Sequence, residues 1–234
     1  MKHRVVLIGL SALAWLLFLP ETRRSKGDDA RQDAGETADL PTLPWRVLLG
    51  TSATVFCSRL VTWGVLAATS ILWLAQLFAD GWHMFGLFVP IATLTGLYIA
   101  LSKLTGIASA RMAGAFSDRW GRRWPVIGLA MGLGGLGLWL MSGEVLWLAL
   151  MGTLLVPLAD GSTETLVPAI AGDRVPSRAR SRALGLINTA GDFGATIGPF
   201  FALGLLNSGG ISLGAIYKIA AILFGVVGLG ALMV

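Results

Sequence analysis

Cysteine, histidine and charged residues are all scarce in this sequence of 234 residues. There is one cysteine, Cys57, which excludes an intramolecular disulfide, and there are only two histidines, His3 and His83. No cluster of histidine and cysteine side chains can be assembled, so we expect no metal site and no cofactor. Charged residues make up 13% of the chain, compared with about 25% in an ordinary soluble domain. The composition therefore argues against a soluble globular fold.

Apolar residues, in contrast, are abundant. Hydrophobic residues make up 55% of the chain and the mean hydropathy is +0.73, which indicates a membrane protein. A net charge of +5 would suit a nucleic-acid partner if the basic residues formed one face or tail. They lie instead in short loops between apolar runs, so we expect them to orient the chain in a bilayer and expect no nucleic-acid partner.

Seven apolar runs are long enough to form membrane helices. The first, at 5–19, has no A-x-A cleavage site after it, so we interpret it as a retained helix rather than a signal peptide. The others cover 47–78, 84–109, 125–142, 145–170, 183–206 and 211–234, each long enough for the ~20 residues that span a bilayer. The predicted fold class is all-α, a polytopic membrane bundle of about seven helices. We expect a transmembrane helix at 1–20, a polar linker at 21–44 and a six-helix domain at 45–234.

The lysines and arginines between these runs fall on one side of the predicted bundle. Five lie in 21–46, four in 111–124 and four in 172–183, whereas none lies in 79–85, 142–145 or 207–212. The positive-inside rule therefore places the linker and the C-terminus in the cytoplasm, beneath a plasma or inner membrane. By parity the N-terminus lies outside, in conflict with the charges of Lys2 and Arg4. We interpret this conflict as a sign that the chain is a fragment that lacks upstream helices.

A charged decapeptide, Gly114-Ala-Phe-Ser-Asp-Arg-Trp-Gly-Arg-Arg123, separates two of the apolar runs. Gly114 and Gly121 permit a tight reversal, and the three arginines cannot enter hydrocarbon cheaply, so we predict a short cytoplasmic hairpin. An ordinary positive-inside loop would explain the arginines but neither Asp118 nor the two glycines.

The decapeptide resembles the motif G-x-L-x-D-R-x-G-R-[RK] of the major facilitator superfamily of secondary transporters, except that Phe116 stands where leucine is usual. Leu19-Pro-Glu-Thr-Arg23 resembles the end of that family's sixth helix, and the segment from Asp173 through Asp192 to Pro199 resembles its tenth-to-eleventh helix junction. The resemblance covers nearly the whole chain and implies helix six, the central loop and helices seven to twelve. An N-terminal half, the competing register, would need an arginine in the helix that ends near 170, where there is none.

The resemblance implies secondary active transport of a small organic solute by alternating access, with proton coupling as one option and no enzymatic activity. Its motif residues would form a cytoplasmic charge latch with Glu21 and Asp173 as partners; they are Gly114, Asp118, Arg119, Gly121, Arg122 and Arg123. Seven helices cannot close a central cavity alone, so besides the lipid bilayer, a solute and a proton we expect an N-terminal half or a second copy as partner.

A non-transporting scaffold or regulatory protein and an inactive truncated relic are the alternatives. An intramembrane hydrolase is disfavoured, since Asp160-x-x-x-Glu164 does not resemble the Gly-x-Gly-Asp pattern of such enzymes.

Ionisable residues inside membrane spans are costly, at about 2.5–3.5 kcal/mol each, and indicate function by default. Five of them share one predicted depth and fall on the helices that line the central cavity of the resembled family; they are Arg59, Lys103, Asp160, Glu164 and Asp192. Asp160 and Glu164 lie one helical turn apart, so their carboxylates crowd each other and can hold a proton near neutral pH. With Asp192 they form our candidate proton site, with Arg59 or Lys103 as counter-charge. A static ion-pair network is the alternative, and Lys218 is expected to snorkel toward the outer face.

Glycine, proline and tryptophan residues within the spans give three further predictions about helix contacts, kinks and packing. Gly194-x-x-x-Gly198 and Gly128-x-x-x-Gly132 predict close helix contacts. Proline removes an intrahelical hydrogen bond and allows a kink, which is expected in the spans at Pro90, Pro157, Pro168 and Pro199. Trp63 and Trp73 lie within a span, where we expect lipid or core packing, with stacking on a solute as the alternative.

Overall fold

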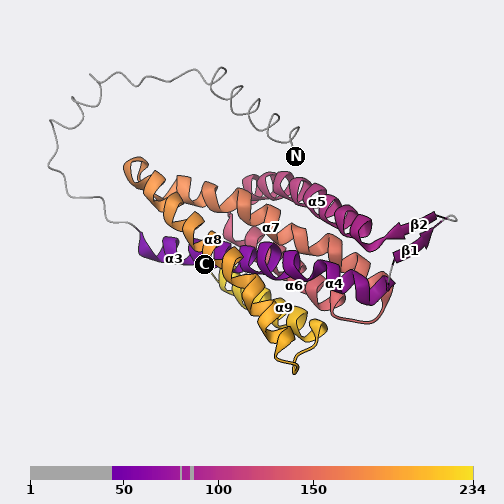
Figure 1. Ribbon diagram of the computed structural model, residues 1–234. Coiled ribbons are helices and arrows are strands. Elements are labelled where there is room, and N and C mark those ends of the chain that lie inside the picture. The colour runs from indigo at the N-terminus through magenta and orange to yellow at the C-terminus, as the bar shows by residue number, and fades with distance from the viewer. Residues whose placement is uncertain (1–43, 80, 85–86, 234) are drawn as a thin grey trace, which may run out of the picture. The chain divides into compact units, whose positions relative to one another are not determined.

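A computed structural model of the chain describes residues 44–79, 81–84 and 87–233, and within them six helices are long and apolar enough to cross a membrane (Figure 1). The first span is one continuous helix from Trp45 to Phe78, in which α3 (Trp45–Arg59) passes through a π-helix, η1 (Leu60–Leu66), into α4 (Ala67–Phe78). The others are α5 (Ile91–Trp120), α6 (Trp124–Met141), α7 (Leu146–Arg174), α8 (Ser177–Asn207) and α9 (Leu213–Leu232). The predicted all-α membrane bundle is confirmed, and the span and linker expected at 1–43 lie outside the described residues.

Two groups of helices make the core. Helix α6 packs against α7 and α9, and the largest fully buried side chains lie among these helices: Tyr217, Phe224, Ile127, Met131 and Leu138. The second group joins α3 and η1 to α8, while α5 lies along α7. Helix α5 is much less buried than the other spans. Only 6% of its most apolar 18-residue stretch is buried inside the protein. Most of its apolar side chains therefore face outward, as expected of a helix that contacts lipid or another polypeptide.

Glycines allow these helices to approach backbone to backbone. A Cβ added at Gly198 would lie 2.5 Å from the Cα of Gly64, and one added at Gly194 would lie 2.5 Å from the carbonyl oxygen of Phe56. Gly161 of α7 meets the backbone of Gly106 of α5 in the same way. Because apolar side chains gain little from leaving lipid for a helix interface, close backbone approach is what lets dispersion forces hold such helices together.

The π-helix interrupts the first span near its middle. A π-helical turn is wider than an α-helical turn and is frequently found at functional sites. In η1 it presents Gly64 to α8, while Thr62 and Trp63 meet Asp160 of α7. One irregular turn therefore contributes both to a packed interface and to a polar cluster.

A short antiparallel hairpin replaces the start of the span that we predicted at 84–109. Strand β1 (Gly81–Met84) pairs with β2 (Leu87–Pro90), and α5 begins only at Ile91. The prediction that Pro90 kinks this helix was wrong, because Pro90 directly precedes it in an extended conformation, with ψ 154°. Proline lacks the N–H that a helix interior requires but is well tolerated just before a helix. Pro157, Pro168 and Pro199 do lie inside α7 and α8.

The predicted hairpin at 114–123 is much shorter than expected. Helix α5 continues through Gly114 to Trp120, so the reversal is confined to residues 121–123. Gly121 ends the helix with φ +62°, a left-handed conformation that glycine adopts at no steric cost. Similarly, the loop predicted at 172–183 shrinks to 175–176, because α7 ends at Arg174 and α8 begins at Ser177. Polar residues at these ends extend the helices beyond the apolar runs.

The glycine contact between η1 and α8 predicts a large effect of a single methyl group. We expect Gly198→Ala to destabilise the bundle by about 1–3 kcal/mol, because the added Cβ would overlap the backbone of Gly64. Gly204→Ala in the same helix is the matched control, since nothing lies within 4 Å of its added Cβ. Thermal unfolding of both variants in detergent would measure the difference, and equal unfolding temperatures would contradict the proposed close contact.

Candidate functional site

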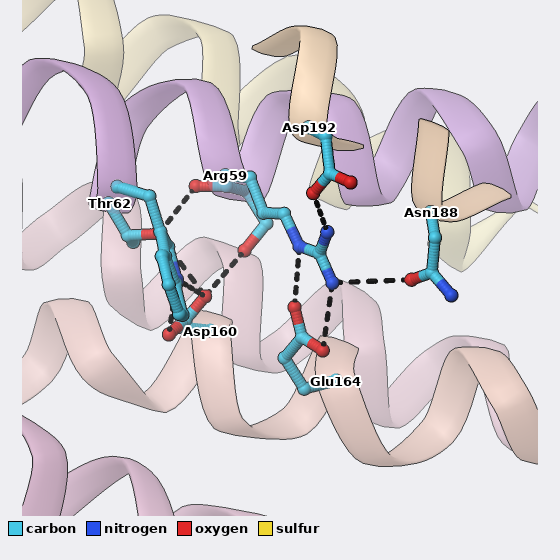
Figure 2. Close-up of polar contacts among 8 residues, drawn as sticks. Arg59, Thr62, Asp160, Glu164, Asn188 and Asp192 are labelled. Atoms are coloured by element: carbon cyan, nitrogen blue, oxygen red, sulfur yellow. Dashed lines mark hydrogen bonds and ion pairs between the residues drawn. The ribbon is translucent and has the colours of Figure 1, made fainter. Parts of the chain in front are cut away.

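Arg59, the last residue of α3, forms the centre of a charged cluster (Figure 2). Its Nε donates to Glu164 Oε1 of α7 at 2.8 Å, and its Nη1 donates to Asp192 Oδ1 of α8 at 2.6 Å. Its Nη2 donates to Glu164 Oε2 and to Asn188 Oδ1, each at 3.3 Å. The guanidinium uses its planar set of donors to bind groups from two other helices at once. The cluster therefore ties α3, α7 and α8 together.

The cluster is open on one side. The side chain of Arg59 is 15% exposed, whereas those of Glu164 and Asp192 are 41% and 73% exposed. Glu164 lies ten residues from the end of α7, which corresponds to a depth of about 15 Å at 1.5 Å per residue. Charges exposed at such a depth in a membrane protein face a water-filled cavity or the rest of the protein, because exposure to lipid is expensive.

Asp160 belongs to a second cluster, one turn before Glu164 on α7. Its carboxylate accepts hydrogen bonds from the hydroxyls of Ser58 at 3.4 Å and Thr62 at 3.1 Å. The indole Nε1 of Trp63 donates to both carboxylate oxygens at 3.2 Å. All three donors are neutral, so they stabilise the carboxylate without cancelling its charge.

Lys103 of α5 approaches the same tryptophan from its ring face. Its Nζ lies 4.1 Å from the centroid of the Trp63 ring, within the range of a cation–π interaction. Asp160, Trp63 and Lys103 line one cavity of about 230 Å³ between the first span, α5 and α7. The remaining wall is mainly apolar and aromatic, with Leu66, Ile99, Val156, Pro157 and Tyr98.

The structure divides the five charged residues that the sequence groups in one layer. It brings together Arg59, Glu164 and Asp192, and it separates Asp160 and Lys103 into the neighbouring cavity. Sequence reasoning missed the roles of Asn188, Ser58 and Thr62. Their spacing was a usable signal, since Asn188 lies four residues before Asp192, and Ser58 and Thr62 are four residues apart.

The other predicted site residues occupy three different places. Trp73 is buried and donates to the carbonyl oxygen of Met141, which is a packing role. Lys218 lies 5.7 Å from the ring centroid of Trp139, away from both clusters. Gly194 and Gly198 lie at the interface of α8 with the first span, and Pro199 follows directly in α8.

Among the residues that the structure describes, no group of three or more His, Cys, Asp and Glu side chains is placed to hold a metal ion.

One ion pair links the decapeptide to the end of α7. Arg123 Nε lies 2.9 Å from Asp173 Oδ2, and Arg180 Nη2 donates to the carbonyl oxygen of Gly172 at 2.6 Å. Asp173 is one of the two latch partners expected from the sequence, and the other, Glu21, lies outside the described residues. Over the part of the chain that is described, Asp118, Arg119 and Arg122 make no ion pair.

The geometry predicts that Arg59 matters for stability because of the carboxylates that it neutralises. We expect Arg59→Leu to destabilise the bundle by about 1–3 kcal/mol, less than the 3–5 kcal/mol typical of a fully buried pair because Asp192 and Glu164 are partly exposed. Adding Glu164→Gln and Asp192→Asn should restore much of the loss. Thermal unfolding measures all of these variants.

The matched control is Arg46→Leu, an exposed arginine of the same helix that makes no ion pair with any described residue. It should leave the unfolding temperature unchanged. An Arg59→Leu protein as stable as the Arg46→Leu protein would show that the cluster does not hold the helices together.

Comparison with known proteins agrees with this architecture. A family model described as the Major Facilitator Superfamily matches residues 91–234, which is 144 of the 234 residues. A search of curated proteins found no match. The matched region includes the decapeptide, α7 with both of its carboxylates and α8 with Asp192. Together with six membrane-length helices, this match shows that the chain is a multi-pass membrane protein and belongs to the major facilitator superfamily of transporters.

Proposed function

We propose that this chain carries a small organic solute across a cell membrane by alternating access, as the C-terminal half of a transporter, in exchange or symport with a proton. The observation that carries the proposal is the Arg59 cluster, in which one cation is shared by the two carboxylates of Glu164 and Asp192. One carboxylate is in excess, so the cluster reaches charge balance when it binds one proton. A cluster that is balanced only when protonated suits a coupling site.

Asp160 does not belong to this proton site in our proposal, although the sequence groups it with Glu164. Its hydrogen bonds come from Trp63, Thr62 and Ser58, and it lines a cavity that the Arg59 cluster does not line. We assign Asp160 and Lys103 to the solute and Arg59, Glu164 and Asp192 to the proton. The two sites are adjacent on α7, which lets occupancy of one affect the other.

Further helices are needed to complete the pathway. The open side of the Arg59 cluster exposes Asp192 and Glu164 deep in the span, and six more helices supplied by an N-terminal half or by a second copy of the chain would cover it. We place the Arg123–Asp173 ion pair at the cytoplasmic face, as the rule that basic loops stay inside predicts. The linker and the C-terminus would lie on the same side.

The transport proposal is tested in proteoliposomes filled with buffer, placed in a mixture of cellular small molecules and given an imposed pH gradient. Mass spectrometry of the vesicle contents should show a small organic solute that accumulates only with the gradient. The protein would be reconstituted both alone and with a six-helix N-terminal unit of the same family. The proposal fails if no solute accumulates in either preparation.

Neutralising the excess carboxylate should change the pH dependence of that uptake. We expect Glu164→Gln to lower gradient-driven uptake at least tenfold and to flatten its dependence on pH, because the cluster then holds no excess carboxylate to protonate. Glu144→Gln is the matched control, since Glu144 lies in the loop between α6 and α7. An unchanged pH profile for Glu164→Gln would rule out Glu164 as part of the proton site.

The ion pair between Arg123 and Asp173 should affect transport rate more than stability. Their side chains are 29% and 54% exposed, so we expect Arg123→Asp to cost no more than about 1 kcal/mol. If the pair acts as a latch, the initial uptake rate should change several-fold and should recover in the Arg123→Asp, Asp173→Arg double variant. Wild-type rates in both single variants would argue for an ordinary surface ion pair.

A further inference from the structure

The charges of the two clusters are balanced in different ways. Arg59 has two carboxylate partners, so its charge is neutralised by the protein itself. Among the described residues, the hydrogen-bond donors to Asp160 are all neutral, and Lys103 lies against the ring face of Trp63. Among the described residues neither Asp160 nor Lys103 takes part in an ion pair. One anion and one cation therefore lie in the wall of the same cavity without a direct ion pair, and their charges attract each other only at longer range.

Trp63 holds these two charges apart. Its indole N–H is directed at the carboxylate of Asp160, while its ring face carries the ammonium group of Lys103. The edge of the Trp63 ring thus contacts the carboxylate of Asp160, and its face contacts the ammonium group of Lys103. The tryptophan itself lines the cavity and is half exposed, so the described helices do not bury it.

The shape and the lining of the cavity limit what can bind there. A volume of about 230 Å³ corresponds to roughly eight water molecules at ~30 Å³ each, enough for a compact organic molecule. Away from the two charges most of the wall is apolar or aromatic, with Leu66, Tyr98, Ile99 and Val156, and the hydroxyls of Ser70 and Ser102 add polar groups. A ligand that fits this wall carries an apolar group beside its polar groups.

Charge balance selects among such ligands. A simple organic anion would pair with Lys103 but leave Asp160 facing a negative charge, and a simple organic cation would leave Lys103 unpaired. A neutral ligand would desolvate both charges and leave them only their longer-range attraction to each other, which is costly in a cavity at membrane depth. A zwitterion pairs with both charges at once.

We propose that this cavity binds a small zwitterionic solute of the α-amino-acid type with an apolar side chain, its carboxylate paired with Lys103 and its ammonium group with Asp160. This inference names the solute of the proposed transporter and rests on that proposed function. It also assigns Trp63 a positioning role, since its N–H and its ring face hold Asp160 and Lys103 at the two ends of the ligand.

The test measures binding rather than transport, so the two proposals can fail separately. Calorimetry on the purified full chain in lipid nanodiscs would compare leucine and phenylalanine with their amides, which lack the carboxylate, and their N-acetyl derivatives, which lack the ammonium group. We expect at least one amino acid to bind about tenfold or more tightly than either of its derivatives, because each derivative loses one charge-assisted contact. Equal binding of an amino acid and its amide, or no binding of either amino acid, would overturn the proposal.

Matched variants assign each charge to its residue. Lys103→Met should weaken amino-acid binding and abolish the preference for the amino acid over its amide, and Asp160→Asn should abolish the preference for the amino acid over its N-acetyl derivative. Lys103→Arg should retain most of the affinity, which separates loss of charge from loss of fold. Lys218→Met is the control, because Lys218 also lies over a tryptophan ring but outside the cavity. Wild-type affinity in Lys103→Met or Asp160→Asn would overturn the assignment.

Discussion

The cost of placing charge inside a membrane is the constraint on which this structure depends. Five ionisable side chains lie within the spans of α3, α5, α7 and α8, and each of them is met by another polar or aromatic group. Arg59 is compensated by carboxylates from two helices, and Asp160 by hydroxyl and indole donors from the first span. Hydrocarbon offers no such partners, so these contacts fix which faces of the helices point toward each other.

Close backbone contacts set the distances at which these charges meet. Gly64 against Gly198 brings η1 and α8 together, and Gly161 against Gly106 does the same for α7 and α5. With larger residues at these points the helices would stand further apart, and the direct hydrogen bond from Arg59 to Asp192 could not form at 2.6 Å. The small residues and the charged residues of the spans are therefore parts of one arrangement.

The arrangement also explains how two neighbouring carboxylates on one helix can serve different purposes. Asp160 and Glu164 are one turn apart on α7, yet they face different partners. The π-helical turn of η1 contributes to this difference, because Thr62 and Trp63 within it reach Asp160, while Arg59 just before it reaches Glu164. Two adjacent but distinct sites of this kind can couple a solute to a proton, which is the relationship we propose here.

Much of the architecture was readable from the sequence, because hydropathy over about 20 residues reports directly on bilayer spans. Membrane class, the helical fold and the family follow from the apolar runs and the decapeptide. The tight reversal falls at Gly121, one of the two glycines singled out for it, while Gly114 lies inside α5. Helix boundaries were less predictable, since α5 and α8 extend beyond their apolar runs into polar residues, where hydropathy carries no information about helix length.

What only the tertiary structure decided is which charges meet. The sequence by itself placed Arg59, Lys103, Asp160, Glu164 and Asp192 at one depth, since depth follows from residue count along a helix. It did not determine the rotation of each helix about its axis, which depends on packing at glycines far away in the chain. That rotation divided the layer into the Arg59 cluster and the Asp160–Lys103 cavity, with Trp63 between the two unpaired charges.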